Sequence, residues 1–450
     1  MTQQSIIKLP QGWASVPLGE IAVWGAGGTP KRSEPSYYDG DIPWVKTGDL
    51  GPRRLKHASE YITELGVKNS SAKLFNRGAI AMYGATIGKT SILDFDATTN
   101  QACAVGQPIK EVTETDFLYY LLKNEKQNFI DKGKGGAQPN ISQQTIKEHY
   151  IGLPPPTEQK RIVEKLDSLL AQVETIQQRL NNLPEIIKRF RQSVLAAAVS
   201  GKLTAQWRSQ NQQEKWQWLT IGDVSTVSTG STPKRTEPTF WDSNDVPWLT
   251  SSVTGKEFCN SATQFVSNKA VKESRLKVFP PGTLLLAMYG EGKTRGQVTE
   301  ISFEATCNQA CAAILVNENK ISKSFVKLRL LENYEATRMA AEGGNQPNLN
   351  LSKVRKITIP VPSIEEQTEI VRLVEQYFAL ADTLEKHMAN AKARVDNLTQ
   401  SILAKAFRGE LVPQDPNDEP ADKLLERIKA ARLEAEKLEK AAKKATKVKR

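Results

Sequence analysis

The sequence is poor in the residues that build disulfides, metal sites and many hydrolytic active sites. It has four cysteines and three histidines in 450 residues, too few for a disulfide framework and a sparse ligand supply for zinc. Cys307 and Cys311 lie in a segment of small residues, and we interpret them as core residues rather than metal ligands. The histidines, His57, His149 and His387, are scattered, so no Ser/His/Asp arrangement is indicated.

Long apolar runs and an N-terminal targeting signal are also missing. No run of about 18 apolar residues occurs, so no transmembrane helix is predicted. The first residues, MTQQSIIKLPQGW, lack the basic and apolar regions of a secretory signal. We therefore expect a cytoplasmic location and no membrane partner.

Nucleotide and methyl-donor motifs are likewise incomplete. GlyAlaThrIleGlyLysThr at 84–90 resembles a phosphate-binding loop, but it has one residue too few between its glycines, and residues 290–294 shorten it further. An Asn/Asp-Pro-Pro-aromatic motif for amino-group methylation does not occur. Asp418, Glu419 and Lys423 only weakly resemble a nuclease cluster, so no catalytic residue is predicted.

The positive charge is concentrated at one end of the chain. The net charge is +11; residues 421–450 hold eight Lys, three Arg and five Asp or Glu, or 11 − 5 = +6, which leaves +5 for the first 420 residues. Charge alone therefore does not identify the body of the chain as a nucleic-acid binder. We expect PQDPNDEP at 413–420 to be a linker and the following tail to be a solvated basic helix.

What the sequence does contain is one unit written twice. The repeated segments include ThrProLysArg at 29–32 and 232–235, Pro-Trp at 43–44 and 247–248, AlaMetTyrGly at 81–84 and 287–290, AsnGlnAlaCysAla at 100–104 and 308–312, and GlnProAsn at 138–140 and 346–348. Residue numbers of the two copies differ by 203 to 208, and from Asn100 onward the difference stays at 208.

Each copy ends in a long helical pattern. Its apolar residues recur in alternating steps of four and three, the period of a packed helical seam. Two matching seams are expected to pack on each other, and two-fold symmetry of the repeats would make them antiparallel. The predicted seam residues are Ile162, Leu166, Leu169, Val173, Ile176, Leu180, Leu183, Ile187, Phe190 and Val194, and Ile370, Val374, Tyr377, Ala381, Leu384, Met388, Ala391, Val395, Leu398 and Ile402.

The helix ends and one interior residue stand out. Gly201 and Gly409 follow the last helical turns, where a terminating glycine is expected. Pro184 removes one backbone hydrogen bond and either kinks or splits the first helix, whereas the second copy has Lys392 at this position.

The patterns predict an α+β protein with two similar globular domains separated by two long antiparallel helices. Short apolar runs at 79–84, 91–95, 283–290 and 312–316 predict strands, and residues 116–130 and 324–341 predict helices. The expected segments are a first domain at 1–153, a helical spacer at 154–204, a second domain at 205–361, a second spacer at 362–412, and a linker with a basic tail at 413–450.

The repeated loops carry binding chemistry. Arg bonds guanine O6 and N7 in pairs, Gln and Asn do the same with adenine N6 and N7, and Lys seeks phosphate. The candidate DNA-binding residues are Lys31, Arg32, Lys46, Thr47, Tyr83, Lys89, Gln138 and Asn140, and Lys234, Arg235, Ser251, Tyr289, Lys293, Arg295, Gln346 and Asn348. Asn140 and Asn348 fit a turn-stabilising role equally well. Trp44, Trp248, Tyr83 and Tyr289 also fit the core or wall of each domain.

Motifs across nearly the whole chain resemble the specificity subunits of type I restriction-modification enzymes. They include LeuProGlnGlyTrp at 9–13, GlyGlyThrPro at 27–30, the proline-rich segments at 151–163 and 359–367, and the helix ends at 193–204 and 401–411. The resemblance implies two target-recognition domains, each reading half of a split site in double-stranded DNA.

The same resemblance implies how such a subunit works with others. Its helices would set the spacing of the half-sites and dock two methyltransferase subunits, which restriction and translocase subunits join. S-adenosylmethionine, ATP and magnesium would be bound by those partners and not by this chain. The alternatives are a recognition subunit of another modular methyltransferase or nuclease system, and a coiled-coil adaptor without DNA specificity.

Overall fold

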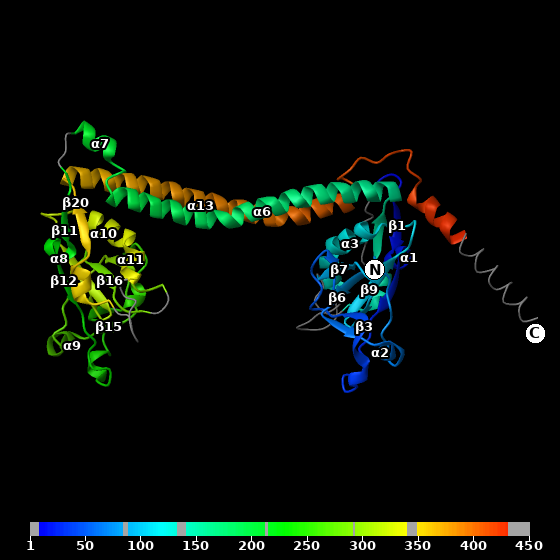
Figure 1. Cartoon of the computed structure of the whole chain (residues 1–450), viewed down its shortest axis with the longest axis horizontal. Helices are drawn as coiled ribbons and strands as arrows, with labels where there is room; N and C mark the ends of the chain where they lie inside the picture. The colour runs from blue at the N-terminus through cyan, green and yellow to red at the C-terminus, as the bar shows by residue number, and fades with distance from the viewer. Residues whose placement is uncertain are drawn as a thin grey trace, which may run out of the picture. The chain divides into compact units, whose positions relative to one another are not determined.

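A computed structural model describes residues 9–83, 89–132, 141–211, 215–290, 293–339 and 349–430. The chain forms two compact units, residues 1–179 with 391–450, and residues 180–390. Each unit combines one globular domain with parts of two long helices (Figure 1). Among the described residues, no helix combines the length and the apolar character needed to cross a membrane.

The first globular domain is built from short strands and helices. Its elements are β1 (Ala14–Pro17), α1 (Leu18–Ile21), β2 (Ala22–Ala26), η1 (Pro35–Tyr37), β3 (Tyr38–Val45), β4 (Arg54–Leu55), β5 (Glu60–Ile62), α2 (Glu64–Lys68), β6 (Ile80–Tyr83), β7 (Thr90–Leu93), β8 (Thr98–Thr99), β9 (Cys103–Pro108), α3 (Thr115–Asn124), α4 (Lys126–Lys132), α5 (Gln143–Lys147) and β10 (Tyr150–Leu153).

The second globular domain repeats this order. Its elements are β11 (Gln217–Thr220), α8 (Ile221–Val224), β12 (Ser225–Thr229), η2 (Pro238–Phe240), β13 (Val246–Leu249), η3 (Ser251–Val253), β14 (Phe258–Cys259), β15 (Phe265–Val266), α9 (Asn268–Glu273), β16 (Leu284–Ala287), β17 (Val298–Ile301), β18 (Thr306–Cys307), β19 (Cys311–Val316), α10 (Lys323–Glu332), α11 (Tyr334–Met339), α12 (Leu351–Arg355) and β20 (Thr358–Val361). The helices α6 (Pro156–Val199), α7 (Ala205–Gln210) and α13 (Ile364–Phe407) lie outside the two domains.

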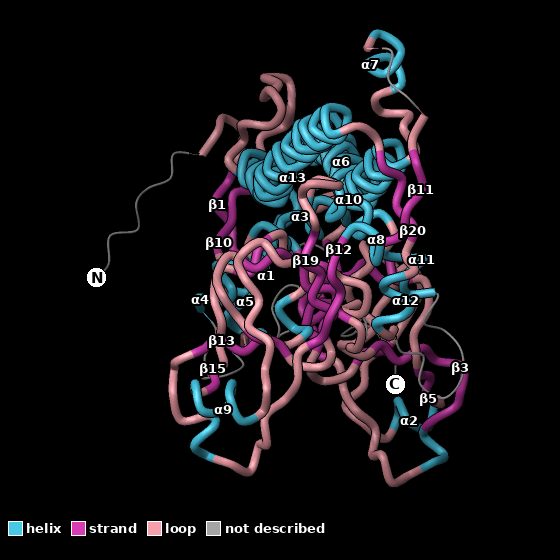
Figure 2. Tube along the Cα trace, turned by 90° about the vertical axis from the view of Figure 1, so that its left-hand side faces the viewer, coloured by secondary structure: helices cyan, strands magenta, loops and turns pink. Residues whose placement is uncertain are grey.

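Both domains have the same sheet topology. The main sheet is β2-β9-β6-β7-β4 in the first and β12-β19-β16-β17-β14 in the second. Each domain also has a three-stranded sheet, with the order β5-β3-β8 in the first and β15-β13-β18 in the second. The third sheet pairs the first and last strands, β1 with β10 and β11 with β20 (Figure 2). The α+β prediction and the strands at 79–84, 91–95, 283–290 and 312–316 are confirmed.

The middle strand of each main sheet, β6 or β16, is apolar at every position and is covered on both faces. In β6, Ile80 and Met82 enter the core on the long-helix side, whereas Ala81 enters a second core on the opposite face. In β16, Leu284 and Leu285 divide in the same way. A strand that is covered on both faces reads as a continuous apolar run, as these do.

The helix predictions at 116–130 and 324–341 are confirmed with interruptions. The first is divided into α3 and α4, and the second into α10 and α11. Asn124 and Glu125, like Asn333 in the second domain, lie at these breaks. Asn has a lower helix propensity than the flanking Leu and Lys, and Glu125 and Asn333 are the C-cap residues of α3 and α10. The apolar period alone does not reveal these breaks.

The two long helices run antiparallel within each unit. In the first unit Gln177 bonds Asp396 (3.4 Å), and Glu158, nearer the start of α6, bonds Gln414 beyond the end of α13 (3.2 Å). In the second unit Arg191 binds Asp382 (2.6 Å), and Arg208, beyond the end of α6, binds Glu366 near the start of α13 (2.7 Å). The antiparallel prediction is therefore confirmed for each unit.

The seam is buried most fully where the helices also contact a globular domain. The buried seam residues are Ile162, Leu166, Val173, Ile187, Val194, Ile370, Val374, Ala381 and Ile402. Four of the predicted seam residues, Ile176, Tyr377, Leu384 and Leu398, are instead exposed, with exposed fractions of 38% to 48%. One partner helix covers only one side of a helix, so residues at the margin of the seam stay open to solvent.

The helix interior and ends settle two sequence predictions. The helix α6 is continuous through Pro184, so Pro184 does not split it. Gly201 and Gly409 have φ of 75° and 74°, the left-handed conformation expected of a terminating glycine.

The C-terminal segment differs from its prediction. Residues 421–430 are helical, but Ala421, Leu424 and Leu425 are buried. Ala421 donates its backbone N–H to the Gly12 carbonyl (2.9 Å), and Lys429 pairs with Glu20 (2.8 Å). The expectation of a solvated helix was therefore wrong for its first turns, because an apolar stripe in this segment packs on the first domain. Residues 431–450 lie outside the described residues.

Candidate nucleic-acid interface

The ThrProLysArg loops are anchored to the AsnGlnAlaCysAla turns in both domains. Thr29 donates its hydroxyl to Gln101, and in the second domain Thr232 donates to Gln309 (2.6 Å). In the sequence, these two motifs appear only as separate repeats. The structure shows that each pair forms one unit, in which the turn holds the start of the loop.

A close backbone approach explains the glycine that precedes each loop. A Cβ on Gly27 would collide with the carbonyls of Thr99 and Asn100, and one on Gly230 with the carbonyl of Cys307. These carbonyls belong to the β8 and β18 edges, against which the loop runs. Only glycine leaves room for the loop at this distance.

A buried tryptophan holds the residue that directly precedes each loop. Trp44 and Trp248 are 2% and 3% exposed, so their alternative interpretation as core residues is confirmed. The Trp44 indole N–H donates to the Gly28 carbonyl (2.9 Å), and Trp248 donates to Ser231 (3.0 Å). Burying an indole with its N–H bonded satisfies both parts of the side chain.

The loop arginine of the first domain lies on an aromatic shelf. Tyr38 and Trp44 pack edge to face with centroids 6.2 Å apart. The Arg32 guanidinium carbon lies 4.7 Å from the Tyr38 centroid and 4.9 Å from that of Trp44. Tyr38 also donates its hydroxyl to the Pro30 carbonyl (2.6 Å). The shelf thus holds both the loop and the cation that it presents.

The second domain builds the same shelf from two tryptophans. Trp241 and Trp248 lie at 90° with centroids 5.1 Å apart. The Arg235 guanidinium carbon lies 3.8 Å from Trp241 and 4.7 Å from Trp248. Trp241 donates its indole N–H to the Lys234 carbonyl (3.2 Å). Arg32 and Arg235 therefore occupy matching positions on similar shelves.

The polar partners of these arginines differ. In the first domain Glu60 binds both Arg32 (2.8 Å) and Lys46 (2.6 Å). The hydrogen bond from Lys46, followed by the contact with Arg32, lowers the pKa of Glu60 despite some desolvation. In the second domain Arg235 donates to the Gln264 amide oxygen (3.2 Å). The predicted residues Arg32 and Lys46 are therefore brought together by a carboxylate that sequence analysis did not select.

The remaining residues near the loops are exposed or half-buried. Lys31 is 72% exposed and pairs with Glu34 (3.6 Å), and Lys234 is exposed. Thr47 and Ser251, which follow β3 and β13 at matching places, are half-buried. Long exposed lysines of this kind are suited to phosphate contacts.

The loops after MetTyrGly are only partly described. Lys89 and Lys293 are exposed, and Arg295 is half-buried. Tyr289 packs against the main core of the second domain, which supports the wall interpretation over base stacking. The Tyr83 side chain, Gln138, Asn140, Gln346 and Asn348 lie outside the described residues, as do most of 84–90 and part of 290–294.

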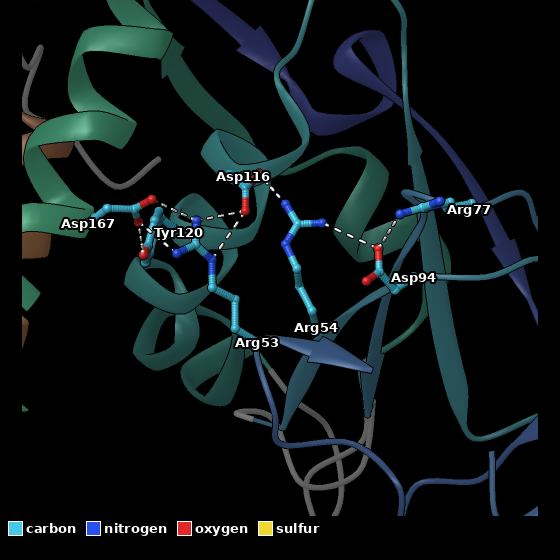
Figure 3. A network of polar contacts seen from close by, with 7 residues as sticks. All are labelled: Arg53, Arg54, Arg77, Asp94, Asp116, Tyr120 and Asp167. Carbon is cyan, nitrogen blue, oxygen red and sulfur yellow. Dashed lines mark hydrogen bonds and ion pairs between the residues drawn. The ribbon is translucent and has the colours of Figure 1, made fainter. Parts of the chain in front are cut away.

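An ion network that sequence analysis missed ties the first domain to α6 (Figure 3). Arg53 binds Asp167 of α6 (2.7 Å) and Asp116 of α3 (2.7 Å). Arg54 binds Asp116 (2.7 Å) and Asp94 (3.6 Å), and Asp94 also binds Arg77 (3.1 Å). Three aspartates neutralise the three arginines, so we interpret the network as a structural contact rather than a DNA-binding surface.

Two groups in this network have shifted pKa values. Burial alone would lower the pKa of Arg53, but its hydrogen bonds to Asp167 and Asp116 outweigh burial and raise it. Burial and a hydrogen bond to Asp167 (2.5 Å) raise the pKa of Tyr120. Arg53 therefore stays charged and Tyr120 neutral across the working pH range. The adjacent arginines gave no periodic signal, because their partners lie far away in the chain.

The described residues supply little catalytic chemistry. Cys103, Cys259, Cys307 and Cys311 are unbridged and buried, which confirms the interpretation of Cys307 and Cys311 as core residues. In the described ranges, no three or more His, Cys, Asp or Glu side chains are grouped so that they could hold a metal ion. His149 contacts Glu125 (2.9 Å) and packs on Phe129 in the core of the first domain.

Comparisons with known proteins match the twofold organisation. A family model described as "Type I restriction modification DNA specificity domain" matches residues 10–185 and 213–392. The chain is 33% identical to the type I restriction enzyme EcoDI specificity subunit of Escherichia coli over 94% of this chain and 96% of that one. It is 30% identical to the StySPI specificity subunit of Salmonella potsdam over the same shares.

Solved structures show the same fold. The HsdS subunit of Thermoanaerobacter tengcongensis has a TM-score of 0.62 at 21% identity and covers 91% of this chain and 100% of its own. A chain from a structure of type I restriction-modification complex assembly and conformational transition has a TM-score of 0.63 at 21% identity, with coverages of 90% and 99%.

Proposed function

This chain belongs to the family of type I restriction-modification specificity subunits, and we propose that it recognises a bipartite DNA site, one half-site per globular domain. The protein is a recognition subunit without catalysis of its own. It acts in the cytoplasm on double-stranded DNA.

One observation carries this proposal more than any other. The same arginine is presented on an aromatic shelf in both domains, Arg32 over Tyr38 and Arg235 over Trp241. A guanidinium whose plane is fixed in advance loses less conformational entropy when it bonds a guanine edge. A structural arginine would not need an exposed loop anchored by a glycine, a threonine and a tryptophan in two separate copies.

The long helices are proposed to set the spacing between half-sites and to dock two methyltransferase subunits. Ile186, Leu380 and Leu384 are exposed on α6 and α13 of the second unit, with exposed fractions of 57%, 50% and 48%. Apolar side chains on a helix pair favour contact with a further protein surface. Restriction subunits join this assembly, and S-adenosylmethionine, ATP and magnesium are bound by the partners, which methylate and cleave the DNA.

The half-sites are proposed to be related sequences in inverted orientation. Both domains share the ThrProLysArg loop, its Thr-Gln anchor and the aromatic shelf. Differences in neighbouring residues then distinguish one half-site from the other. Mapping methylated adenines genome-wide in a host that carries this chain and its methyltransferase tests the idea, and wholly dissimilar half-sites contradict it.

Replacing Arg32 with Ala tests base reading directly. The variant is expected to relax or weaken one half-site by about 1–3 kcal/mol, the range of one bidentate base contact. The matched variant Arg235→Ala is expected to affect the other half-site. Equal weakening on all sequences would assign the arginines to phosphate, and binding without sequence preference in the wild type would favour the adaptor alternative.

Inserting about four residues, one helical turn, between Ile176 and Leu180 tests the spacer role. The non-specific spacer is expected to lengthen while both half-sites stay the same. Changed half-sites would contradict the proposal that the helices act as a ruler.

A further inference from the structure

The backbone places one side chain of each domain beside the arginine shelf. Glu60 is the cross-strand partner of Trp44 in the β3–β5 pairing. Gln264 accepts a backbone hydrogen bond from Trp248 (2.9 Å) at the matching point of the second domain. Directly opposed residues of a strand pair are close neighbours. The side chain at position 60 or 264 therefore reaches the guanidinium that lies on the tryptophan.

The two side chains differ in what they can bond. The Glu60 carboxylate only accepts hydrogen bonds, and it contacts Arg32 and Lys46 at 2.8 Å and 2.6 Å. The Gln264 amide accepts from Arg235 at 3.2 Å and has an NH₂ group left to donate. The second domain also lacks the lysine, because Thr250 follows β13 where Lys46 follows β3.

Both side chains are partly open to a ligand, although the Glu60 Oε2 atom, which lies 2.8 Å from Arg32, is itself buried, so that only Oε1 can accept from a base. The Glu60 side chain is 32% exposed and the Arg32 side chain 55%, and Gln264 and Arg235 are exposed. The first domain thus presents an arginine with a carboxylate, and the second an arginine with an amide. A carboxylate accepts from the cytosine N4 amino group, whereas an amide pairs with adenine N6 and N7.

We infer that this position determines specificity: next to a guanine read by the arginine, Glu60 selects cytosine in one half-site and Gln264 selects adenine in the other. The inference rests on the proposed function, since it assumes that these loops read DNA. It adds a residue that distinguishes two domains with otherwise similar loops. Lys46 contributes by holding the Glu60 carboxylate ionised and in place.

Exchanging the two residues tests the inference. The full-length chain, co-expressed with its methyltransferase subunits, is prepared as wild type, Glu60→Gln and Gln264→Glu, and each complex is bound to a pool of double-stranded DNA with a random central tract. Sequencing the bound DNA is expected to show that Glu60→Gln changes the preference from cytosine to adenine by about tenfold at one position of one half-site. Gln264→Glu is expected to produce the reverse change in the other half-site.

Glu34→Gln serves as the matched control. Glu34 also pairs with a loop cation, Lys31, but at 3.6 Å and with both side chains well exposed. Its replacement is expected to leave every base preference unchanged. Thermal unfolding of each variant checks that the complexes remain folded, and the exposed position of Gln264 makes Gln264→Glu safe in this respect.

The outcomes separate this inference from the proposed function. A wild-type complex that enriches no sequence defeats both. A wild type that enriches a bipartite site, with both exchange variants retaining its base preferences, overturns the inference and leaves the function standing. A uniform loss of binding on every sequence in folded variants also overturns it, because Glu60 and Gln264 would then only hold the arginines in place.

Discussion

The glutamates at the start of the two long helices occupy the same repeat position but have different partners. Glu158 and Glu366 are 1% and 0% exposed. Each accepts the indole N–H of the tryptophan that opens its domain, Trp13 at 3.1 Å and Trp216 at 2.8 Å. The scaffold around the two carboxylates is therefore the same.

The segment that follows each helix supplies the difference. In the second unit Arg208 and Thr204 bond Glu366 at 2.7 Å each. In the first unit the neutral Gln414 bonds Glu158 at 3.2 Å. Both Arg208 and Gln414 also donate to the terminating glycine of the neighbouring helix, Gly201 or Gly409. Two residues at different repeat positions thus make similar contacts, and only Arg208 is charged.

The two repeats therefore share a fold but stabilise it with different polar contacts. Burial raises the pKa of Glu158, against the hydrogen bonds of Gln414 and Trp13. An ion pair replaces that neutral contact in the second unit. Charged contacts at the long-helix side also differ: Arg53 binds Asp167 of α6 in the first unit, whereas Lys323 and Lys327 of α10 bind Glu300 of β17 in the second.

Replacing Glu366 with Gln is expected to have the largest effect, which is a loss of stability of the second unit. It leaves Arg208, 26% exposed, without its anionic partner, and breaking one side of a largely buried pair is expected to cost the second unit about 2–3 kcal/mol. Hydrogen exchange of peptides from 180–390 measures the loss. Glu158→Gln is the matched control, with no destabilisation expected because Gln accepts the same bonds. Equal losses in the two variants would show that the charge is irrelevant.

Replacing Arg53 with Met is expected to have the next largest effect. The first unit loses the bridge between α3 and α6, about 1–2 kcal/mol once solvent screening at this partly exposed site is taken into account. Faster hydrogen exchange in α3 is the readout. Arg77→Met is the control, because Arg77 is 71% exposed with one partner in this network, and a change below about 0.5 kcal/mol is expected. If both variants behave alike, Arg53 is not the tie.

Replacing one shelf residue in each domain compares the two arginine sites. Arg235 lies 3.8 Å from Trp241 and Arg32 lies 4.7 Å from Tyr38. Trp241→Leu is therefore expected to weaken its half-site by about 1 kcal/mol, and Tyr38→Leu by less. Affinities for DNA carrying one mutated half-site at a time measure each effect. A larger effect of Tyr38→Leu would mean that shelf distance does not control presentation of the arginine.

The smallest expected effect is a pH dependence of the C-terminal segment. Because the folded-state pKa of Glu158 is raised, its contribution to stability is fully present below the unfolded pKa and is lost as pH rises through the folded value. Lowering the pH from neutral to about 5 should raise the free energy of opening of 413–430 by less than about 1 kcal/mol. Hydrogen exchange, corrected for the intrinsic exchange rates at each pH, measures this free energy.

The neighbouring Asp418 does not obscure this test. Arg161 lowers the pKa of Asp418, so its contribution is present above the unfolded pKa and is lost only at more acidic pH. Glu158→Gln is expected to abolish the dependence between neutral pH and about 5. A dependence that persists in this variant would assign it to another group.

Much of the fold was predictable because it is periodic and repeated. The strands at 79–84 and 312–316 and the two long helices follow from apolar spacing, and the antiparallel arrangement follows from the symmetry of the repeats. The seam was overestimated at Ile176 and Leu384 because a pattern does not say how many neighbours cover it. The buried first turns of 421–430 were missed because the high charge of the tail concealed a short apolar stripe.

The candidate site was predictable in part. Repetition selected Arg32 and Arg235, and the structure gives both the same aromatic shelf. Glu60 and Gln264 were missed because they differ between the copies, and a search for repeated residues passes over such positions. Gln138, Asn140, Gln346 and Asn348 remain predictions.

The duplication, the two long helices and the loops with binding chemistry can be recognised from the residues, because repeats and apolar periods are local properties of a chain. Which loop residues act together depends on contacts between distant segments. Thr29 meets Gln101, Arg32 meets Glu60, and Arg53 meets Asp167 across long stretches of sequence. Ion pairs and stacking depend on distances in space, which no spacing along the chain encodes.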